Sequence, residues 1–494
     1  MAHPAFPSLP PPGASSSSSS SGIPVIRSAK SVSDIITGCN TFDLIYHTLV
    51  PAFHDLAWGK GQPGQNPKEN ADAGQDILAL WDQDLYSLSQ ERIRQMTAGL
   101  VFVVSARLAR PIKEGYNADL LRFATAVAMH GDRQQILLTG PRVSNLAWGI
   151  LRLAQHLKQP ELALRPLEAL TQVFDFDVFS GAYAAYLEAC LITRRFDYAL
   201  PVTQPIFTEF IAGGPTYLDV ITYYHHAGLV CAAVKDFARA KRFFSIAVAV
   251  PTATASAIQL TAAKRAILCG LIDNGELLSF PRYTSGTITR MIDRNAKEYT
   301  KLGKAFESHD WKIVREAAAS KEFTEDCNYG LLEQVMNSIP RRRILRIQTM
   351  YSRMTVRDLA AKAGLSGPEG VQKVGMILQD MVATKSISAS ISGDAEAVVT
   401  FHDDATDYNS QQTLREVADV KAMATWLEKE LARGSDKLGI SRSYLKKQVG
   451  LLEGNGGPNG GKKSRGDTSD QLFGGAASRG GLKGVGADWG DMGF

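Results

Sequence analysis

Residues 354–401 read MTVRDLAAKAGLSGPEGVQKVGMILQDMVATKSISASISGDAEAVVTF. The first part predicts a helix in which Leu359 and Ala360 face inward and Gly364 ends the helix. Pro368 suits the first position of a further helix, because its fixed φ matches and its missing N–H is not needed there. The apolar spacing of that helix predicts an inward face made of Val371, Val374, Leu378 and Met381.

The alternation in the next segment, SISASIS, has a period of two, which is typical of a strand. Ile387, Ala389 and Ile391 alternate with serines, Gly393-Asp394 predicts a turn, and Ala397 to Phe401 predicts the returning strand. A helix before this region is predicted from Ile344, Leu345, Ile347 and Tyr351. Helix, helix, turn, helix and a two-stranded hairpin together predict a winged helix over residues 339–402.

Upstream of residue 338 the apolar spacing is 3 and 4, which predicts a succession of amphipathic helices. Three segments, PELAL (160–164), FDYAL (196–200) and FARAK (237–241), each begin a predicted helix with alanine at the fourth position. Trp311 and Val314 fit the same frame about two periods later. A repeat of about 40 residues indicates stacked helical pairs in which the small residue allows close approach.

The fold class expected is therefore mainly α: a helical-repeat (TPR/HEAT-like) solenoid, then a winged-helix module and a C-terminal bundle helix. The expected segments are a disordered leader (1–30), an N-terminal helical region (31–119) with a flexible insertion near 59–74, a repeat array (120–338), the winged helix (339–402), a C-terminal helix (403–435) and a flexible glycine-rich tail (436–494).

The C-terminal helix carries an apolar seam with spacings of 3, 4, 3 and 4, as in a coiled coil or helical bundle. Its residues are Val417, Val420, Ala424, Leu427 and Leu431. One helix cannot bury such a seam alone, so we expect another helix to cover it.

Composition excludes several classes of protein. The chain has 494 residues and a formal net charge of +4, so no strong overall field draws it to nucleic acid or to an anionic membrane. Five cysteines without CxxC spacing argue against a disulfide framework and against a zinc ribbon. No uninterrupted run of about 18 apolar residues predicts a membrane span, and the first residues lack the apolar core of a secretory signal.

Catalytic signatures are missing from the sequence. It contains no HExxH, GxSxG or phosphate-binding glycine motif in the expected folded region, and no His-x-His zinc motif of a metallohydrolase. His225 and His226 are adjacent, so their side chains point about 100° apart on a helix and are poorly placed to chelate one metal. We therefore expect no enzyme activity, no cofactor and no metal.

The predicted winged helix is compatible with two functions, nucleic-acid binding and pairing with another protein's sheet. Arginines at 341–343, 346, 353 and 357 favour nucleic-acid binding, but the third helix and the serine-rich wing present a nearly neutral surface to a nucleic acid. The alternative is that the edge formed by Ser386, Ile387, Ser388, Ala389, Ser390 and Ile391 pairs with another sheet, because it carries neither charge nor proline. A short solvated wing is the other explanation of that edge, and the sequence leaves both open.

Four stretches resemble PCI-domain proteins, and among them the subunit 3 family of the COP9 signalosome. They are YYHHAGLVCAAVKDFARAKRFFSIAVAVP (223–251), AFESHDWKIVREAAASKEFTEDCNYGLLEQV (305–335), LAAKAGLSGPEGVQKVGMILQDMVATKSISASIS (359–392) and FHDDATDYN (401–409). The resemblance extends over residues 120–432. Scaffold subunits of the proteasome lid and of a translation-initiation complex share the layout, and the local motifs favour the signalosome.

The resemblance implies a non-catalytic scaffold subunit, with the zinc isopeptidase that removes the ubiquitin-like modifier from cullins in a different subunit. The implied partners are the other PCI and MPN subunits of that complex and, indirectly, cullin-RING ligases, in the nucleus and cytoplasm. In this family winged helices associate through their sheets and C-terminal helices gather in a bundle. On this chain the sheet contact falls at 386–391 with 397–401, and the bundle contact falls on the seam.

Overall fold

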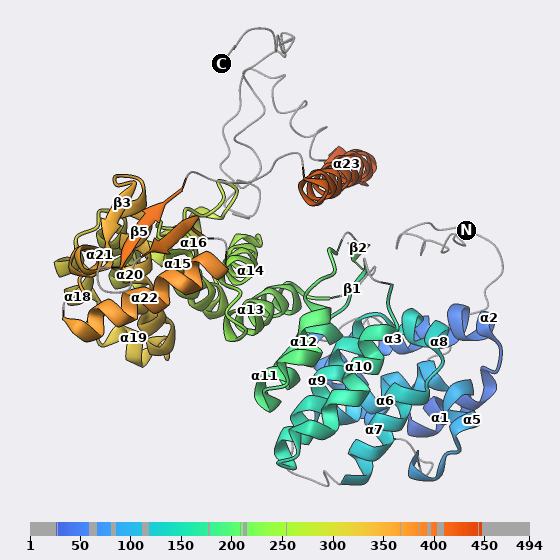
Figure 1. Ribbon diagram of the computed structural model, residues 1–494. Coiled ribbons are helices and arrows are strands. Elements are labelled where there is room, and N and C mark those ends of the chain that lie inside the picture. The colour runs from blue at the N-terminus through green and yellow to red at the C-terminus, as the bar shows by residue number, and fades with distance from the viewer. Residues whose placement is uncertain are drawn as a thin grey trace, which may run out of the picture. The chain divides into compact units, whose positions relative to one another are not determined.

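The computed structural model describes residues 26, 28–58, 67–80, 85–110, 118–175, 178–207, 209–210, 215–252, 254–365, 367–384, 386–392, 397–402, 410–442 and 444–446. Helices dominate this part of the chain (Figure 1). It divides into two compact units, one reaching Ser338 and the other starting at Ile339 and including residues 251–255. None of the helices described here is long and apolar enough to cross a membrane.

The first unit begins with helices that precede the repeats. They are α1 (Ala29–Gly38), α2 (Phe42–Leu44), the π-helical turn η1 (Ile45–Leu49), α3 (Val50–Trp58), α4 (Pro67–Ala79), the short 3₁₀ turn η2 (Leu85–Ser87), α5 (Gln90–Gln95), α6 (Thr97–Ala109), α7 (Ala118–His130) and α8 (Arg133–Thr139). The core of this region includes α6, which is buried along almost its whole length.

The repeats follow as helix pairs. They are α9 (Pro141–His156) with η3 (Pro160–Ala163) and α10 (Leu164–Gln172), α11 (Ala182–Thr193) with α12 (Phe196–Val202), α13 (Tyr217–Ala233) with α14 (Phe237–Ala249), α15 (Ala257–Asp273) with α16 (Gly286–Asn295), α17 (Lys297–Glu307) with α18 (Trp311–Ala318), and α19 (Glu322–Glu325) with α20 (Tyr329–Gln348). Two short strands, β1 (Val178–Phe179) and β2 (Glu209–Phe210), pair in parallel.

One turn geometry recurs between the helices of five pairs. A residue with left-handed φ stands two positions before the second helix at Lys158, Arg194, Lys235, His309 and Cys327. The following N–H donates to the carbonyl five residues back, as from Arg195 to Cys190 at 2.9 Å and from Asp236 to Cys231 at 2.9 Å. These bonds satisfy carbonyls that the first helix leaves unpaired at its end. The chain therefore repeats one helical hairpin, each time with the same type of turn.

The small residues predicted from the repeat lie between the paired helices. Ala163, Ala199, Ala240 and Val314 are all fully buried, each at the fourth position after the turn. Glycine allows a still closer approach between α13 and α14, since a Cβ on Gly228 would lie 2.6 Å from the ring of Phe244. The mainly α solenoid that the sequence predicts is confirmed, and the fifth turn at Cys327 is a repeat element that the sequence pattern had not indicated.

A largely buried network of polar side chains joins three elements at the end of the array, which are α15, α17 and the segment between α19 and α20. The Lys264 ammonium lies 2.6 Å from the Asp326 carboxylate, which also accepts a bond from the Tyr299 hydroxyl at 2.8 Å. Asn328 donates to that hydroxyl at 3.0 Å and accepts from Arg265 at 3.1 Å. This network holds the residues directly before α20 in place, because each side chain in it bonds to a side chain from another element.

His225 of α13 extends this network through Arg265. Its Nε2 lies 2.7 Å from a guanidinium nitrogen of Arg265, and the adjacent His226 contacts the Ala184 carbonyl through Nδ1 at 3.4 Å. Burial, Arg265 and His226 together lower the pKa of His225 to about 3. Both histidines thus act as packed neutral side chains in a helix, and neither belongs to a metal cluster among the described residues.

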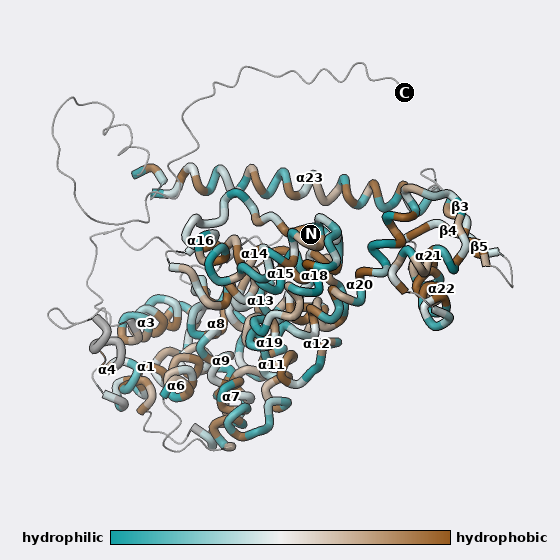
Figure 2. The backbone as a smooth tube through the Cα atoms, turned by 90° about the vertical axis from the view of Figure 1, so that its left-hand side faces the viewer, coloured by the Kyte–Doolittle hydropathy of each residue, from teal (hydrophilic) through white to brown (hydrophobic). Residues whose placement is uncertain are grey.

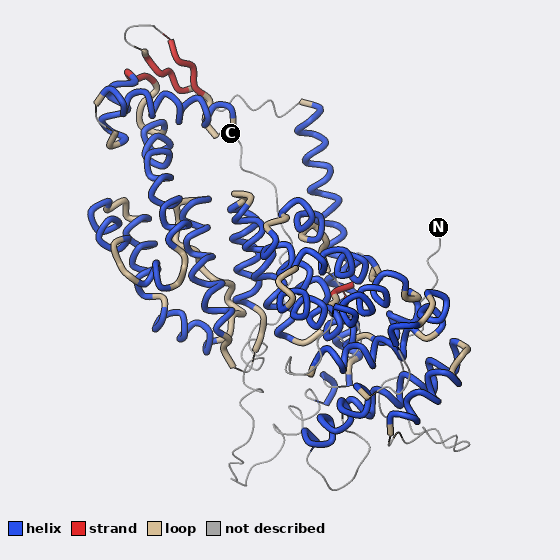
Figure 3. The backbone as a smooth tube through the Cα atoms, turned by 90° about the horizontal axis from the view of Figure 1, so that it is seen from below, coloured by secondary structure: helices blue, strands red, loops and turns tan. Residues whose placement is uncertain are grey.

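The second unit contains the winged helix. The end of α20 packs with β3 (Arg353–Thr355), α21 (Val356–Ala363), α22 (Pro368–Ala383), β4 (Ala389–Ser392) and β5 (Val398–Phe401). The strands form an antiparallel sheet in the order β3–β5–β4, drawn in red in Figure 3. Gly364 ends α21 with φ +81°, as predicted, and Val374, Leu378 and Met381 of α22 are buried in the core.

Several boundaries differ from the prediction. β4 begins at Ala389 rather than Ser386, because the N–H groups of Ser386 and Ile387 donate to the Met381 carbonyl and hold that stretch against the end of α22. The third strand, β3, was not predicted, since three residues are too few to show a period. Tyr351 lies beyond the end of α20 and is exposed.

Three segment predictions also need correction. Residues 67–74, expected in a flexible insertion, lie in α4, which starts at Pro67 as a first-turn proline can; residues 59–66 lie outside the described part. Helix α1 takes in the last two residues of the expected leader, of which 1–25 and 27 are not described. The C-terminal helix is α23 (Gln411–Ile440), longer at its end than the predicted 403–435, while 403–409 and 447–494 lie outside the described residues.

Replacing Gly228 with alanine should lower the free energy of unfolding by about 1–3 kcal/mol, because the added methyl group overlaps the Phe244 ring. Gly375 in α22 is the matched control, since nothing lies within 4 Å of its Cβ position. Gly375→Ala should stabilise by about 0.5–1 kcal/mol through helix propensity. Urea unfolding followed by circular dichroism measures both; equal effects of the two substitutions would contradict close packing at Gly228.

Lowering the pH should destabilise the first unit through His225. Its pKa is low in the folded chain, so the unfolded chain takes up a proton near the ordinary pKa of 6.5 while the folded chain does not. This contribution is complete above about pH 6.5 and is lost toward pH 3, at up to about 1.4 kcal/mol per pH unit. His225→Gln should show a flatter decline of unfolding free energy between about pH 6 and pH 4; identical slopes would refute the assignment.

Candidate assembly surfaces

The outer strand of the winged-helix sheet is β4, which pairs with β5 on one side only. The two strands align Ala389 with Phe401 and Ile391 with Val399. The N–H of His402 donates to the Ser388 carbonyl at 2.8 Å, which marks residues 388 and 402 as a hydrogen-bonded pair. Because such pairs alternate in antiparallel sheets, Ser390 and Ser392 also bond to β5. The N–H and C=O groups of Ala389 and Ile391 therefore point away from the sheet, available to an added strand.

The predicted edge residues separate into three roles. Ile387 is buried in the winged-helix core, whereas the Ser386 hydroxyl contacts the Thr384 hydroxyl at 3.0 Å and helps end α22. The Ser390 hydroxyl lies 2.8 Å from Nε2 of His402, so this serine supports the pairing of the two strands. Ser388 contributes its carbonyl to the same pairing. Only Ala389 and Ile391 offer free backbone groups.

Ile391 belongs to the apolar half of the alternation, yet 41% of its surface is exposed. Its cross-strand neighbour Val399 is fully buried, and neighbours in register lie on the same face of a sheet. Ile391 is thus on the core side but at the open edge, where no further strand covers it. An apolar side chain and unpaired backbone groups coincide at this position.

The second surface is α23, a helix of 30 residues without a buried side chain. Val420 is 69% exposed and Leu431 is 74% exposed. The other seam residues, Val417, Ala424 and Leu427, are exposed as well. Apolar segments recur along this helix in Figure 2. The structure places all five predicted seam residues on one helical face, and it shows no described element covering them.

The exposed apolar surface of α23 is larger than the sequence pattern indicated. Leu438 continues the seam by one heptad, and Met423 borders it. Leu414 and Trp426 lie beside the seam at about 100° or more from its centre, and both are exposed. The spacing of 3 and 4 does not include these residues, so sequence reasoning missed them. A surface this wide fits contact with more than one neighbouring helix.

The arginines before and within the winged helix are partly engaged by the protein itself. Arg341 pairs with Asp380 of α22, and Arg343 donates to the Ala363 carbonyl at 2.9 Å. The ring of Tyr351 lies under the Lys362 ammonium at 3.9 Å. These side chains hold α20, α21 and α22 together, which leaves less positive charge for phosphate contacts.

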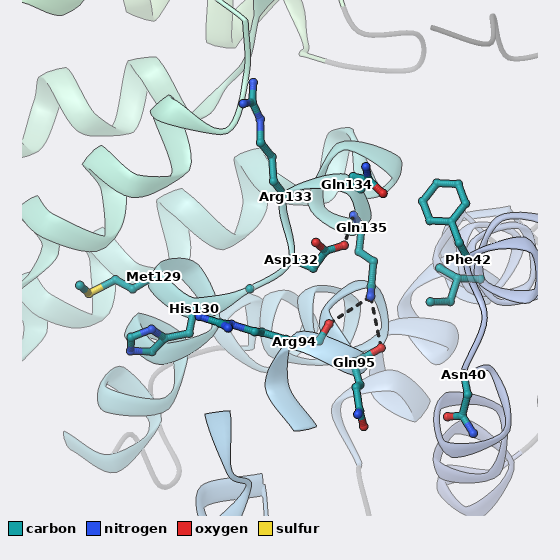
Figure 4. A pocket seen from close by; sticks show the side chains of 12 residues that line it. Asn40, Phe42, Arg94, Gln95, Met129, His130, Asp132, Arg133, Gln134 and Gln135 are labelled. Carbon is teal, nitrogen blue, oxygen red and sulfur yellow. Dashed lines mark hydrogen bonds between the residues drawn. The ribbon is translucent and has the colours of Figure 1, made fainter. Parts of the chain in front are cut away.

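A pocket in the first unit is lined by residues near α2, α5, α7 and α8. It has a volume of about 630 Å³ and is open to solvent. Figure 4 shows Asn40 and Phe42 across from Arg94, Gln95 and Gln135. Gln135 donates to the carbonyls of Arg94 and Gln95 at 3.0 and 3.3 Å and accepts from the Ala98 N–H at 3.0 Å, so its amide joins α8 to α5 and α6.

Two further polar groups of this pocket, Asp132 and Arg133, have similar structural roles. Asp132 accepts from the Gln135 N–H at 3.1 Å and caps α8, while Arg133 donates to the Val173 carbonyl at 2.7 Å and to Asp175 at 2.9 Å. The residues that line it bring together neither two carboxylates nor a nucleophile with a base. We assign no chemistry to this pocket.

Comparisons with known proteins agree with this architecture. A family model for the N-terminal helical repeats of COP9 signalosome complex subunit 3 matches residues 68–288, and a PCI domain model matches residues 308–402. The COP9 signalosome complex subunit 3 of Dictyostelium discoideum is 23% identical over 322 residues, which cover 64% of this chain and 76% of that protein. The subunit 3 of Emericella nidulans is 24% identical over 294 residues, covering 53% of this chain and 59% of that protein.

Two substitutions in the hairpin region separate folding from docking. Ile387→Asp should unfold the winged helix, because an unpaired charge in its core costs several kcal/mol. Ile391→Asp is the matched control, because its side chain already reaches solvent at the edge. The second variant should change the free energy of unfolding by less than about 1 kcal/mol. Thermal unfolding compares them, and equal loss of stability would show that the strand edge is part of the core.

Proposed function

This chain belongs to the subunit 3 family of the COP9 signalosome, and we propose that it is a non-catalytic scaffold subunit that supports the removal of the ubiquitin-like modifier from cullins. In this role it regulates cullin-RING ubiquitin ligases by holding other subunits in place. The isopeptidase site resides in a different subunit. The partners are other PCI and MPN subunits of the complex, and the chain acts in the nucleus and cytoplasm.

The observation that carries this proposal is that none of the side chains of α23 is buried in the described part of the chain. A helix of 30 residues with an apolar seam gains most of its stability from packing that seam against neighbours. No side chain of α23 is buried among the described residues, which supports a covering surface supplied by other chains. A seam with heptad spacing selects helices as partners, which fits a bundle of C-terminal helices from several subunits.

The winged-helix edge supports the same role. Ala389 and Ile391 present unpaired backbone groups beside an exposed apolar side chain, in a strand without charge or proline. Such edges pair with other strands unless they are protected. We propose that the sheet of a neighbouring winged helix docks at β4. The repeat array (120–338) and the winged helix (339–402) carry this edge and position it for docking.

Charges on the seam should abolish assembly without unfolding the chain. Val420→Asp combined with Leu427→Asp puts two carboxylates on a face that solvent already covers in the isolated chain, so its thermal unfolding should not change. In the assembled complex both charges would be buried without partners, at a cost of several kcal/mol. Copurification with the other subunits should fall at least about tenfold.

The control for this variant uses the opposite face of α23. Ala418→Asp with Thr425→Asp repeats the spacing of seven residues and the change in charge, about 160° and 140° away from Val420 around the helix. This control should copurify like the wild type. If the seam variant also copurifies at wild-type stoichiometry, the seam does not bind partners.

A tagged purification from the native cells tests the family role as a whole. We expect a multi-subunit particle of defined mass in which cullin deconjugation activity resides in another chain. A lone protein would contradict the scaffold role. So would a protein that retains nucleic acid through a wash at physiological salt, because it would identify the winged helix as a nucleic-acid reader.

A further inference from the structure

A basic groove lies on the repeat array, between α16, α17 and α18. It has a volume of about 740 Å³ and opens to solvent. Lys297, Lys301 and Lys304 of α17 line it, together with Ile313 of α18 and Asp293 of α16. It belongs to the first unit, whereas β4 and α23 belong to the second.

The three lysines occupy one face of α17. Their positions i, i+4 and i+7 fall within an arc of about 60°. The opposite face of the helix is buried and includes Tyr299, Leu302 and Phe306. The lysine face therefore cannot rotate away from the groove, because the core fixes the helix about its axis.

These charges are poorly compensated within the protein. Lys301 has one ion pair, with Glu298 at 4.0 Å, and both side chains reach solvent. Lys297 and Lys304 form no ion pair with any described residue. Like charges one turn apart destabilise a helix by a few tenths of a kcal/mol each. The net charge of the whole chain is only +4, so this cluster is a local feature rather than a result of general basicity.

The spacing of the charges indicates the shape of a complementary ligand. Seven residues of α-helix span about 10.5 Å, so the three lysine positions follow one another along the helix axis at about 5 Å, close to one helical turn of 5.4 Å. Carboxylates at the same positions of a second helix would follow them closely. An extended strand repeats side chains on one face every 6.6–6.8 Å or so, and three of them would span about 13 Å.

We propose that this groove docks an acidic α-helix of a partner protein, with carboxylates at i, i+4 and i+7 facing the three lysines. One apolar side chain of that helix packs against Ile313, which is 38% exposed at the edge of the groove. Charge complementarity gives the specificity and the association rate, and the apolar contact adds affinity. This surface is distinct from those of the proposed scaffold role, so either can fail without the other.

The test uses the full chain and two synthetic helical peptides of about 20 residues, a length at which alanine-rich peptides form helices. Both contain three glutamates and one leucine in an alanine and glutamine background. In the first peptide the glutamates stand at i, i+4 and i+7, and in the second they are spread around the helix. Fluorescence anisotropy should give a dissociation constant at least about tenfold lower for the first peptide in low salt, with most of the binding lost near 0.5 M salt or so.

Charge-reversal variants localise the site. Lys297→Glu, Lys301→Glu and Lys304→Glu combined should abolish binding of the first peptide. The control combines Lys30→Glu, Arg92→Glu and Arg165→Glu, which changes the net charge equally at exposed positions far along the chain. Should the first triple variant fail to fold by circular dichroism, the corresponding lysine-to-glutamine variant takes its place.

The outcomes decide the proposal. Preference for the first peptide, lost in the groove variant and kept in the control, supports it. Equal binding of both peptides would overturn it, as would an equal loss in both triple variants, because either result indicates a general electrostatic field. Equally tight binding of a short DNA strand that depends on the three lysines would also overturn it, since the groove would then be a general polyanion site.

Discussion

The structure depends on one constraint, which is that an amphipathic helix must cover its apolar face. In the repeat array each helix achieves this by packing against its neighbours along the chain, as α13, α14 and α15 do. Gly228 and the buried alanines bring the helices of a pair close together, and the left-handed residues at the turns reverse the chain in the same way each time. The helices of the array therefore cover one another's core faces.

The same constraint is not satisfied at the end of the chain. The face of α23 that carries Val420 and Leu431 has no cover among the described elements, and β4 leaves the backbone of Ile391 unpaired. Exposed apolar faces and open strand edges of this kind typically mark sites where a partner binds. In the scaffold role that we propose, partner subunits cover these surfaces, and the repeat array carries the docking elements.

The sequence predicted those features that depend on local periodicity. The core face of α22, the stop at Gly364 and the seam of α23 follow from spacings of 3 and 4 or from the φ that only glycine adopts readily. Features that arise from tertiary contacts were missed. The start of β4 shifted because Met381 accepts the N–H groups of Ser386 and Ile387, and Ile391 is exposed because its strand is the outermost one. Trp426 and Leu414 lie outside the periodic seam, so no pattern identified them, and the lysine groove needs three helices to be assembled.

Amide hydrogen exchange, compared between the isolated chain and the purified complex, tests the central claim most directly. We predict that the amides of Ala389 and Ile391, together with those along α23, exchange much more slowly in the complex, because partners pair the strand edge and stabilise the helix. Amides inside the repeat array, such as that of Val230, should exchange at similar rates in both. Unchanged exchange at β4 and α23 on assembly would contradict the account, because the two surfaces would then remain open to solvent in the complex.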